Sequence, residues 1–365
     1  MIKVLTIFGT RPEAVKMCPL VTEIASRPEI KSIVCVTAQH RELLDGVLEI
    51  FNINPDHDLD IMREGQTLSE ITSRVLTGLE SVIIAEHPDI VLVHGDTSTT
   101  FASSLAAFYQ KVKVGHVEAG LRTHNKYFPF PEELNRRMTS AIADLHFCPT
   151  ALNRDNLLRE NIPQENIFIT GNTVIDALRT TVRADQKFSP EIDFNKRVIL
   201  MTAHRNENLG QPLRNICEAA AKIANDFSDV QIVYPMHPNP KVRGTARDVL
   251  GNVKNVLLCE PLDVVELHNL MARSYMVLTD SGGLQEEAPS LGKPVLVLRG
   301  ETERPEAVEA GTVKIAGTDV LNIYNLSKML LTEADEYEKM SKAVNPYGDG
   351  HASARITDVI IDKLG

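Results

Sequence analysis

Short apolar runs recur along the chain, separated by segments with the apolar spacing of amphipathic helices. We interpret as strands the runs at residues 2–8, 33–37, 90–93, 113–117, 143–148, 198–202, 231–235, 256–259, 276–279 and just before Arg299. Strands that alternate with helices in this way are typical of parallel sheets covered on both faces. We therefore predict an α/β fold of two Rossmann-like doubly wound domains that face a central cleft.

The segment from Thr170 to Asn195 is polar, lacks the alternation of a strand and marks the predicted connection between the domains. We place the N-terminal domain at residues 1–170 and the C-terminal domain at 171–365, with the last helix as a candidate to pack back on the N-terminal domain. Ligands of doubly wound folds bind outside the carboxyl ends of the strands. Polar residues follow almost every predicted strand, so we expect the ligand site there, between the domains.

Composition argues against several classes of protein. The chain of 365 residues carries a net charge of −11, which argues against nucleic acid or an anionic membrane as the main partner. Its first residues have the pattern of a strand rather than of a signal peptide, and no apolar run approaches the ~18 residues of a membrane span. The five cysteines are scattered and odd in number, which is typical of reduced thiols in a cytoplasmic protein.

The stretch 276–307 carries the most informative polar residues. A predicted strand ends before the Ser281–Gly283 turn, whose glycines let the backbone approach a ligand without a Cβ. Helix-forming residues follow, so free N–H groups would face an anion such as phosphate, although a tight turn alone would give the same three residues. Glu287 could accept from ribose hydroxyls, and Arg304 brings a cation to the same edge. Together these residues favour a nucleotide-sugar site.

A second candidate phosphate site follows the first predicted strand. Arg11 and Lys16 flank the expected start of the first helix, where they could reach a diphosphate. Solvated basic residues around a well-capped helix would give the same pattern. The segment lacks G-x-G-x-x-G, which argues against a nicotinamide cofactor bound in the usual Rossmann mode.

Acidic residues stand at three successive strand or helix ends of the N-terminal half. Asp96 and Glu118 follow predicted strands, and Glu132 lies at the start of a charged helix. Each alone could simply cap a helix. If the three converge on one cleft, they would raise one another's pKa, which is how enzymes obtain an acid and a base near neutral pH.

Histidines accompany these acids and recur in the C-terminal half. His94 and His116 each stand two residues before an acid, and we interpret them as core or supporting groups. His204 begins a polar run after a strand and could stabilise a leaving phosphate or donate a proton. No metal is expected: H-x-x-x-H and H-E-x-x-H are absent, and the D-x-D at Asp58 and Asp60 fits a surface turn.

With these residues assembled, the chain resembles the non-hydrolysing UDP-N-acetylglucosamine 2-epimerases. The resemblance runs nearly end to end through FGTRPEAVKMCPL, VHGDT, HVEAGLRT, FPFPEELNRR, TDSGGLQEEAPSLGKPVLVLR and TERPEA. It implies two Rossmann-like domains of the glycosyltransferase B type in a homodimer. It also implies interconversion of UDP-GlcNAc and UDP-ManNAc without nicotinamide or metal, for the synthesis of cell-surface polysaccharide precursors.

The resemblance also implies a mechanism and a role for each matching residue. UDP leaves by anti elimination to give 2-acetamidoglucal and returns by syn addition. The implied acid/base groups are Asp96, Glu118 and Glu132, and His204 would lie near the leaving diphosphate. The implied phosphate-binding residues are Arg11, Lys16, Ser281, Gly282, Gly283 and Arg304, with Glu287 on the ribose. Escape of UDP would turn such an enzyme into a slow hydrolase, so domain closure is expected.

Many members of this family bind a second UDP-GlcNAc as an activator. The matching candidates for that allosteric site are Gln39, His40, Arg205 and His237. Two positions depart from the family pattern, because Glu42 replaces a common glutamine and Gly65 a common arginine. An added anion and a lost cation weaken a phosphate site, so we expect reduced or absent activation. A sigmoidal dependence of rate on UDP-ManNAc, relieved by traces of UDP-GlcNAc, would contradict this expectation.

Three other functions stay open at this point. A glycosyltransferase of the same fold would need an acceptor groove, and none is evident in the N-terminal loops. A hydrolysing epimerase would release the sugar as free ManNAc, a difference that the sequence does not decide. A nucleotide-sugar sensor would bind without turnover, and the presence of all three candidate acids argues against it.

Overall fold

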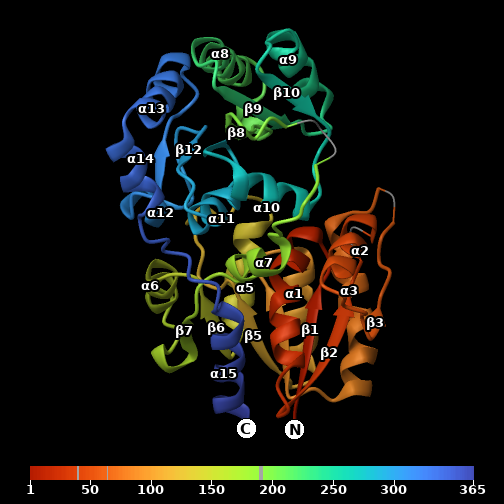
Figure 1. Cartoon of the computed structure of the whole chain (residues 1–365). Helices are drawn as coiled ribbons and strands as arrows, with labels where there is room; N and C mark the ends of the chain where they lie inside the picture. The colour runs from red at the N-terminus through yellow and green to blue at the C-terminus, as the bar shows by residue number, and fades with distance from the viewer. Residues whose placement is uncertain (39–40, 64, 189–191) are drawn as a thin grey trace. The chain divides into compact units, whose positions relative to one another are not determined.

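The computed structural model describes residues 1–38, 41–63, 65–188 and 192–365, with the backbone alone for 41–43. The chain folds into two compact units (Figure 1). The first comprises Met1–Thr180 together with Tyr347–Gly365, and the second comprises Thr181–Pro346. Each unit is built on its own parallel sheet with helices on it, which confirms the predicted α/β fold class.

The first unit extends beyond the predicted N-terminal domain of residues 1–170. It includes residues 171–180 and also helix α15 (Ala352–Leu364). Helix α15 packs against α1 (Arg11–Ala25). Asp176 of helix α7 (Thr173–Thr181) also accepts hydrogen bonds from the first two backbone N–H groups of α15, at 3.1 and 2.8 Å. These bonds hold the end of the chain to a segment that precedes the second unit.

Seven parallel strands form the sheet of the first unit, in the order β3-β2-β1-β4-β5-β6-β7. Their bounds are β1 Ile2–Phe8, β2 Ile30–Val36, β3 His57–Asp58, β4 Ile90–His94, β5 Lys113–Val117, β6 Leu145–Cys148 and β7 Ile167–Ile169. Besides α7 and α15, the helices are α1 Arg11–Ala25, α2 Arg41–Ile50, α3 Leu68–Glu86, α4 Ser98–Tyr109, α5 Glu132–Ile142, α6 Ala151–Arg159 and the short η1 Gln164–Asn166. Apolar side chains of α3 and α4 pack on β1, β2 and β4 as one buried cluster.

The sheet of the second unit has six parallel strands in the order β10-β9-β8-β11-β12-β13. Their bounds are β8 Arg197–Thr202, β9 Val230–Pro235, β10 Val256–Cys259, β11 Met276–Thr279, β12 Val295–Val297 and β13 Val313–Ile315. The helices are η2 Asn206–Asn208, α8 Gln211–Asp226, α9 Pro240–Leu250, α10 Val264–Arg273, α11 Leu284–Ser290, α12 Pro305–Glu309, α13 Val320–Thr332 and α14 Ala334–Ser341. Side chains of α8, α9 and α13 form one cluster with this sheet.

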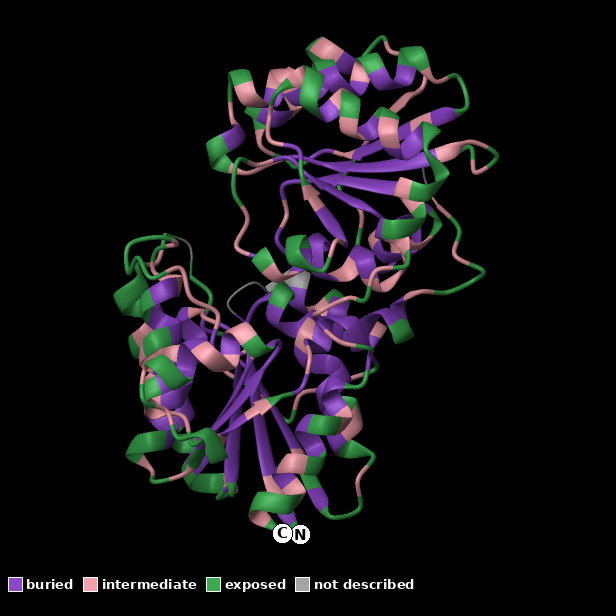
Figure 2. Cartoon of the chain, turned by 90° about the vertical axis from the view of Figure 1, so that its left-hand side faces the viewer, coloured by how far each residue is buried: buried purple, intermediate pink, exposed green. Residues whose placement is uncertain are grey.

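The sequence pattern located the central strands and the edge strand β10 but missed the other three edge strands. Figure 2 shows the central strands of each sheet as almost wholly buried, and unbroken apolar runs mark such strands. β3, β7 and β13 were not predicted. They have two or three residues each, with one buried residue at most, which is too short for an apolar run or an alternation to stand out from the neighbouring loops.

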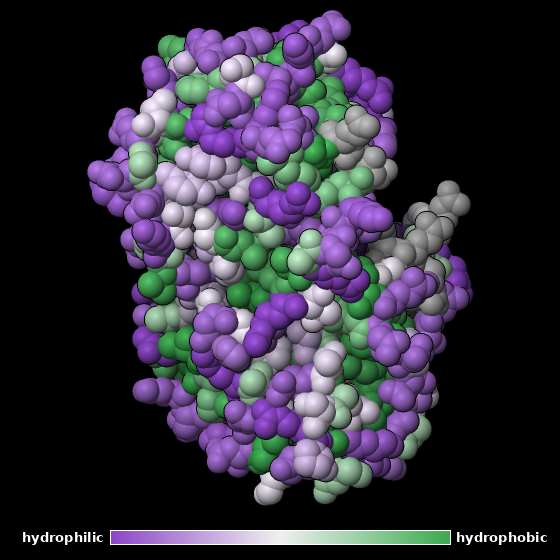
Figure 3. All heavy atoms as spheres, in the orientation of Figure 1, coloured by the Kyte–Doolittle hydropathy of each residue, from purple (hydrophilic) through white to green (hydrophobic). Residues whose placement is uncertain are grey.

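Hydrophilic side chains predominate on the face in Figure 3. The cysteines are free, and all except Cys259 are buried. Within the described ranges, no helix combines the length and the apolar character needed to cross a membrane.

Candidate active site

Glu118 is held at the end of β5 by contacts from three other segments of the first unit. Its carboxylate forms an ion pair with Lys16, accepts a hydrogen bond from the Asn172 side-chain amide at 2.7 Å, and lies 3.6 Å from Nε2 of His94. The backbone of Glu118 is left-handed, with φ +60°. Such strained backbone in a residue other than glycine is uncommon and concentrates at functional sites.

Asp96 follows β4 and lies beside the loop of Glu118. The backbone N–H of Gly95 donates to the carbonyl of Val117 at 2.9 Å, which joins the two strand ends. Asp96 forms an ion pair with Arg136, whose side chain is almost wholly buried. The structure therefore brings two of the predicted acids to one edge of the sheet, each with its own cationic partner.

The first two acids of α5 differ in burial and partners. Glu133 is fully buried and accepts hydrogen bonds from the backbone N–H groups of Thr123 and His124 at 3.0 and 3.1 Å. Glu132 is half-buried at the first position of α5. Because Glu133 is used to hold the preceding loop, Glu132 is the member of the pair that remains a candidate for chemistry.

Arg11 and Lys16, the two cations predicted at the start of α1, have different environments. Arg11 is exposed at the first position of the helix, whereas Lys16 lies one turn further on and pairs with Glu118. Sequence reasoning did not assign Glu13, between them, to the site. Its carboxylate is buried and accepts from the backbone of Gly9 and Thr10 and from the hydroxyls of two threonines after β4. The capping-box spacing of Thr10 and Glu13 was the available signal.

In the second unit, the buried carboxylate of Asp280 organises the segment after β8. Its Oδ2 accepts from the backbone N–H groups of His204 and Arg205 at 2.8 Å each and from the Asn208 amide at 3.0 Å. The ring of His204 stacks on that of His237, with centroids 5.3 Å apart. Burial, followed by the nearby His237 and Arg205, lowers the pKa of His204, while Asp280 opposes this shift.

The Ser281–Gly283 turn lies between β11 and α11, beside two guanidinium groups. A Cβ added at Gly282 would lie 3.8 Å from Nη2 of Arg205 and 3.9 Å from Nη2 of Arg304. Arg304 is largely buried and forms an ion pair with Glu286. A glycine flanked by two arginines leaves room and charge for an anion at this turn.

Glu287 is held by a histidine that sequence reasoning did not assign. Nε2 of His268 lies 3.1 Å from the accepting Glu287 carboxylate, and Nδ1 of the same ring lies 2.7 Å from the Thr181 hydroxyl. His268 is almost wholly buried. A Cβ at Gly283 would lie only 3.0 Å from Oε1 of Glu287. Glu287 therefore has a fixed place beside the glycine turn, set by residues distant in sequence.

Part of the candidate allosteric site lies outside the described residues. Gln39 and His40 are not described, and nothing is described of the Glu42 side chain. Gly65 is exposed with φ +69°. Of the other candidates, Arg205 lies beside Gly282. The exposed His237 stacks on His204, whose backbone N–H donates to Asp280 just before the predicted phosphate turn.

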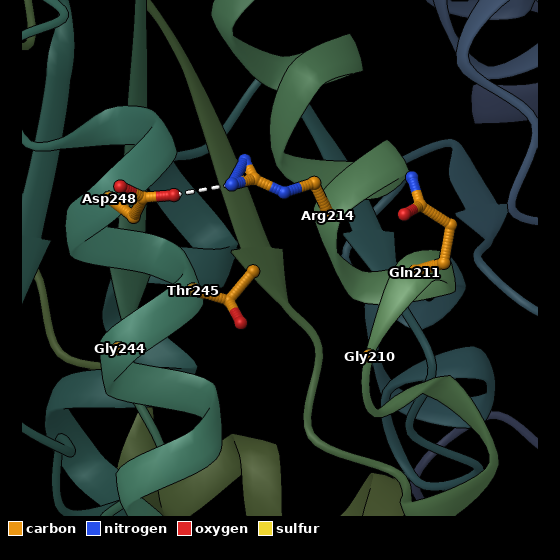
Figure 4. Close-up of a pocket in the computed structure, with 6 residues that line it drawn as sticks. All are labelled: Gly210, Gln211, Arg214, Gly244, Thr245 and Asp248. Carbon is orange, nitrogen blue, oxygen red and sulfur yellow. Dashed lines mark hydrogen bonds and ion pairs between the residues drawn. The ribbon is translucent and has the colours of Figure 1, made fainter.

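The second unit also has a surface pocket of about 390 Å³. Figure 4 shows it between α8 and α9, lined by Gly210, Gln211, Arg214, Gly244, Thr245 and Asp248. The side chains of Arg214 and Asp248 pair with each other across it at 2.5 Å. Its two charges thus neutralise one another, and none of the predicted site residues lines it.

Two buried histidines make the stability of the first unit dependent on pH. His116 and His146 face each other on neighbouring strands, and burial lowers their pKa values to about 3 and about 4. The unfolded chain binds these protons near pH ~6.5 and the folded chain does not. The free energy of unfolding should therefore fall as the pH drops below about 6.5, by up to ~1.4 kcal/mol per pH unit for each histidine.

Urea unfolding at several pH values between about 7 and about 5 measures this slope. In His146→Gln, the change in the free energy of unfolding per pH unit should be smaller by the contribution of about one proton. A slope in this variant equal to that of the unchanged protein would contradict the assignment of the proton to His146.

The fold and these residues define a class of protein. Two Rossmann-like parallel sheets, one with acids at its strand ends and one with a glycine turn between arginines, are the features of an enzyme that acts on nucleotide sugars. No group of three or more histidine, cysteine, aspartate or glutamate side chains within the described ranges could hold a metal ion.

Comparison with known proteins identifies the family. Residues 22–361 match the family model described as UDP-N-acetylglucosamine 2-epimerase. The chain belongs to this family and is accordingly an epimerase, an enzyme of the isomerase class. It is 61% identical to the UDP-N-acetylglucosamine 2-epimerase of Bacillus subtilis, over 100% of this chain and 96% of that protein.

Solved structures of similar proteins agree with the fold. The UDP-GlcNAc 2-epimerase from Neisseria meningitidis, solved bound to UDP-GlcNAc, is 50% identical with a TM-score of 0.91, over 99% of this chain and 100% of that one. MnaA of S. aureus, in a co-structure with UDP, is 52% identical with a TM-score of 0.91, over 100% and 97% of the two chains. These likenesses confirm the two-domain Rossmann-like architecture of the glycosyltransferase B type.

Proposed function

We propose that this protein interconverts UDP-GlcNAc and UDP-ManNAc by inverting C2 of the sugar, for the synthesis of cell-surface polysaccharide precursors. The observation that carries the proposal is the pair of carboxylates at the strand ends of the first unit. Glu118 is fixed by Lys16 and Asn172, and Asp96, beside it, is fixed by Arg136. Proton abstraction next to a leaving group needs acid and base groups held in this manner.

The proposed reaction removes a proton and UDP and then returns both. A base takes the C2 proton while the C1–O bond to UDP breaks in the anti sense, giving 2-acetamidoglucal. An acid then delivers a proton to the opposite face of C2, and UDP adds back to C1 in the syn sense. Asp96, Glu118 and Glu132 are the candidates for these proton transfers. Each proton removed is balanced by one returned, so no redox cofactor is required.

Charges in the second unit support binding of the diphosphate. The Ser281–Gly283 turn lies beside Arg205 and Arg304, and arginine is well suited to phosphate because it donates several hydrogen bonds from one plane. We assign the turn and Arg304 to the diphosphate and His204 to the charge that develops as UDP leaves. Arg11, exposed at the start of α1, is a further phosphate candidate, whereas Lys16 is committed to Glu118.

Proton NMR of the purified protein with UDP-GlcNAc in D2O, with no added cofactor, tests the function. Formation of UDP-ManNAc with deuterium at C2, and entry of deuterium into UDP-GlcNAc, would establish proton abstraction and epimerisation. Free ManNAc and UDP as the main products would establish the hydrolysing reaction instead. An unchanged spectrum, with UDP-GlcNAc binding shown by calorimetry, would favour the transferase or sensor and contradict the assignment of the acids.

The role of Glu287 can be tested through the ribose it is proposed to bind. We expect Glu287→Gln to weaken binding of UDP by about 10-fold, the size of one hydrogen bond to a charged group. The same substitution should have little effect on 2′-deoxy-UDP or 3′-deoxy-UDP, whichever lacks the hydroxyl that Glu287 accepts from. Calorimetry with the three ligands measures the difference. Equal losses for all three would show that Glu287 does not contact the ribose.

A homodimer and a cytoplasmic location, both implied by the family resemblance, complete the proposal. Light scattering coupled to size-exclusion chromatography measures the mass of the particle in solution and so tests the homodimer. A mass of one chain, 40.4 kDa, at working concentration would contradict it.

A further inference from the structure

Asp280 is a charged residue to which the proposed reaction gives no role. It follows β11 and has no exposed surface. A buried carboxylate costs several kcal/mol of desolvation unless other groups compensate for it. Both carboxylate oxygens of Asp280 therefore need partners that compensate for their burial.

The two carboxylate oxygens of Asp280 differ in the hydrogen bonds that they accept. Oδ2 accepts the three hydrogen bonds from the segment after β8, including the backbone N–H of His204. Oδ1 is buried and accepts no hydrogen bond within the described part of the chain. It lies 3.4 Å from Nδ1 of His204, so the unsatisfied oxygen is aimed at the imidazole.

We propose that Asp280 is the positioning residue for His204 in the epimerisation. In this arrangement Oδ1 accepts from Nδ1–H, which fixes the tautomer and the orientation of the ring. Nε2 lies on the opposite side of the ring. When Nε2 is protonated as well, the imidazolium donates a hydrogen bond from Nε2–H to the leaving diphosphate, and the Asp280 carboxylate stabilises that imidazolium. The inference rests on the proposed function, because it needs His204 to act on the diphosphate.

The charged surroundings of His204 make this role of Asp280 necessary. Burial disfavours the imidazolium, as do His237 stacked on the ring and the neighbouring Arg205, while Glu207 and Asp280 favour it. Glu207 is exposed and forms an ion pair with Arg299, so solvent and that cation screen its charge. The fully buried Asp280 is screened far less and supplies the larger opposing effect.

The tautomer of His204 can be measured in the unchanged protein. Two-dimensional NMR that correlates ring protons with nitrogen-15, assigned with His204→Asn, shows which nitrogen carries the proton. We expect the neutral ring to be protonated at Nδ1. A ring protonated at Nε2 alone would overturn the proposal. This measurement requires no turnover, so it remains informative even if the protein does not epimerise UDP-GlcNAc.

Asp280→Asn removes the negative charge of this residue and nearly preserves the shape of its side chain. The amide oxygen can still accept from the backbone N–H groups, but the negative charge is lost. We expect the pKa of His204, followed by the same NMR signals, to fall, and kcat to fall about 10- to 100-fold, as for loss of one hydrogen bond to a charged group. Asn208→Ala is the matched control, since it removes one donor to Oδ2 and keeps the carboxylate. It should leave the His204 titration unchanged.

A double-mutant cycle decides whether Asp280 acts through His204. If it does, Asp280→Asn should cost much less activity in the His204→Asn background than in the unchanged protein. Equal costs in both backgrounds, with equal loss of melting temperature in Asp280→Asn and Asn208→Ala, would indicate a merely structural carboxylate and overturn the proposal.

Discussion

Replacing Glu118 with glutamine should lower kcat for epimerisation of UDP-GlcNAc by about 10²- to 10⁴-fold, the usual share of a group that transfers a proton. Glutamine keeps the shape of the side chain and can still accept a hydrogen bond from Asn172. It cannot take a proton from C2 or return one to it. Entry of deuterium at C2 should slow with kcat, while the dissociation constant for UDP, measured by calorimetry, should change little.

Glu86→Gln is a matched control for this substitution. Glu86 also pairs with a histidine and a lysine, at 2.8 Å from His57 and 3.9 Å from Lys31. It lies at the opposite end of the sheet from Glu118, since its carbonyl accepts from Lys3 near the start of β1. Its loss should leave kcat within about twofold, as expected of a surface ion pair. If Glu118→Gln is as active as Glu86→Gln, Glu118 has no part in the chemistry.

The second large effect concerns the stability of the loop that follows Glu118. We expect Gly120→Ala to lower the free energy of unfolding by about 3 kcal/mol or more. Gly120 has φ +89°, and a Cβ there would lie 2.2 Å from the carbonyl oxygen of Asn153. Asn153 belongs to the capping box of α6, so the backbone cannot move away without loss of that cap. Urea unfolding followed by circular dichroism measures the change.

Gly46→Ala provides the comparison in the same unit. Gly46 lies inside α2, and an added Cβ would meet no atom of the described residues within 4 Å. This substitution should raise the free energy of unfolding by about 0.5–1 kcal/mol, because alanine favours the helix interior. A Gly120→Ala protein as stable as Gly46→Ala would show that the loop can rearrange around the new side chain.

The same loop shows what a sequence can and cannot reveal about the site. HVEAGLRT placed an acid after a buried strand, and the structure keeps Glu118 there. The pattern of acids alone suggested mutual repulsion among three carboxylates. The structure instead gives Asp96 and Glu118 a cation each, Arg136 and Lys16. The cation of Asp96 comes from a helix 40 residues further along the chain, and no local pattern identifies such a partner.

Supporting residues were the hardest to find from the sequence. Glu13, His268 and Asp280 are all buried, and each fixes a segment or a side chain that is distant in sequence. The residue type alone does not show whether a polar side chain is buried or exposed. Its role depends on which donors and acceptors the tertiary structure brings within about 3 Å, the distance of a hydrogen bond.

The sequence by itself determined the positions of the central strands and helices along the chain and the residues that stand at the strand ends. It could do so because apolar runs and helical spacing are local properties of the chain. It also carried enough family motifs to indicate the epimerase family. Only the tertiary structure decided the edge strands β3, β7 and β13, the inclusion of residues 171–180 in the first unit, and the partners of each charged side chain. Those features depend on contacts between distant segments, which no local pattern records.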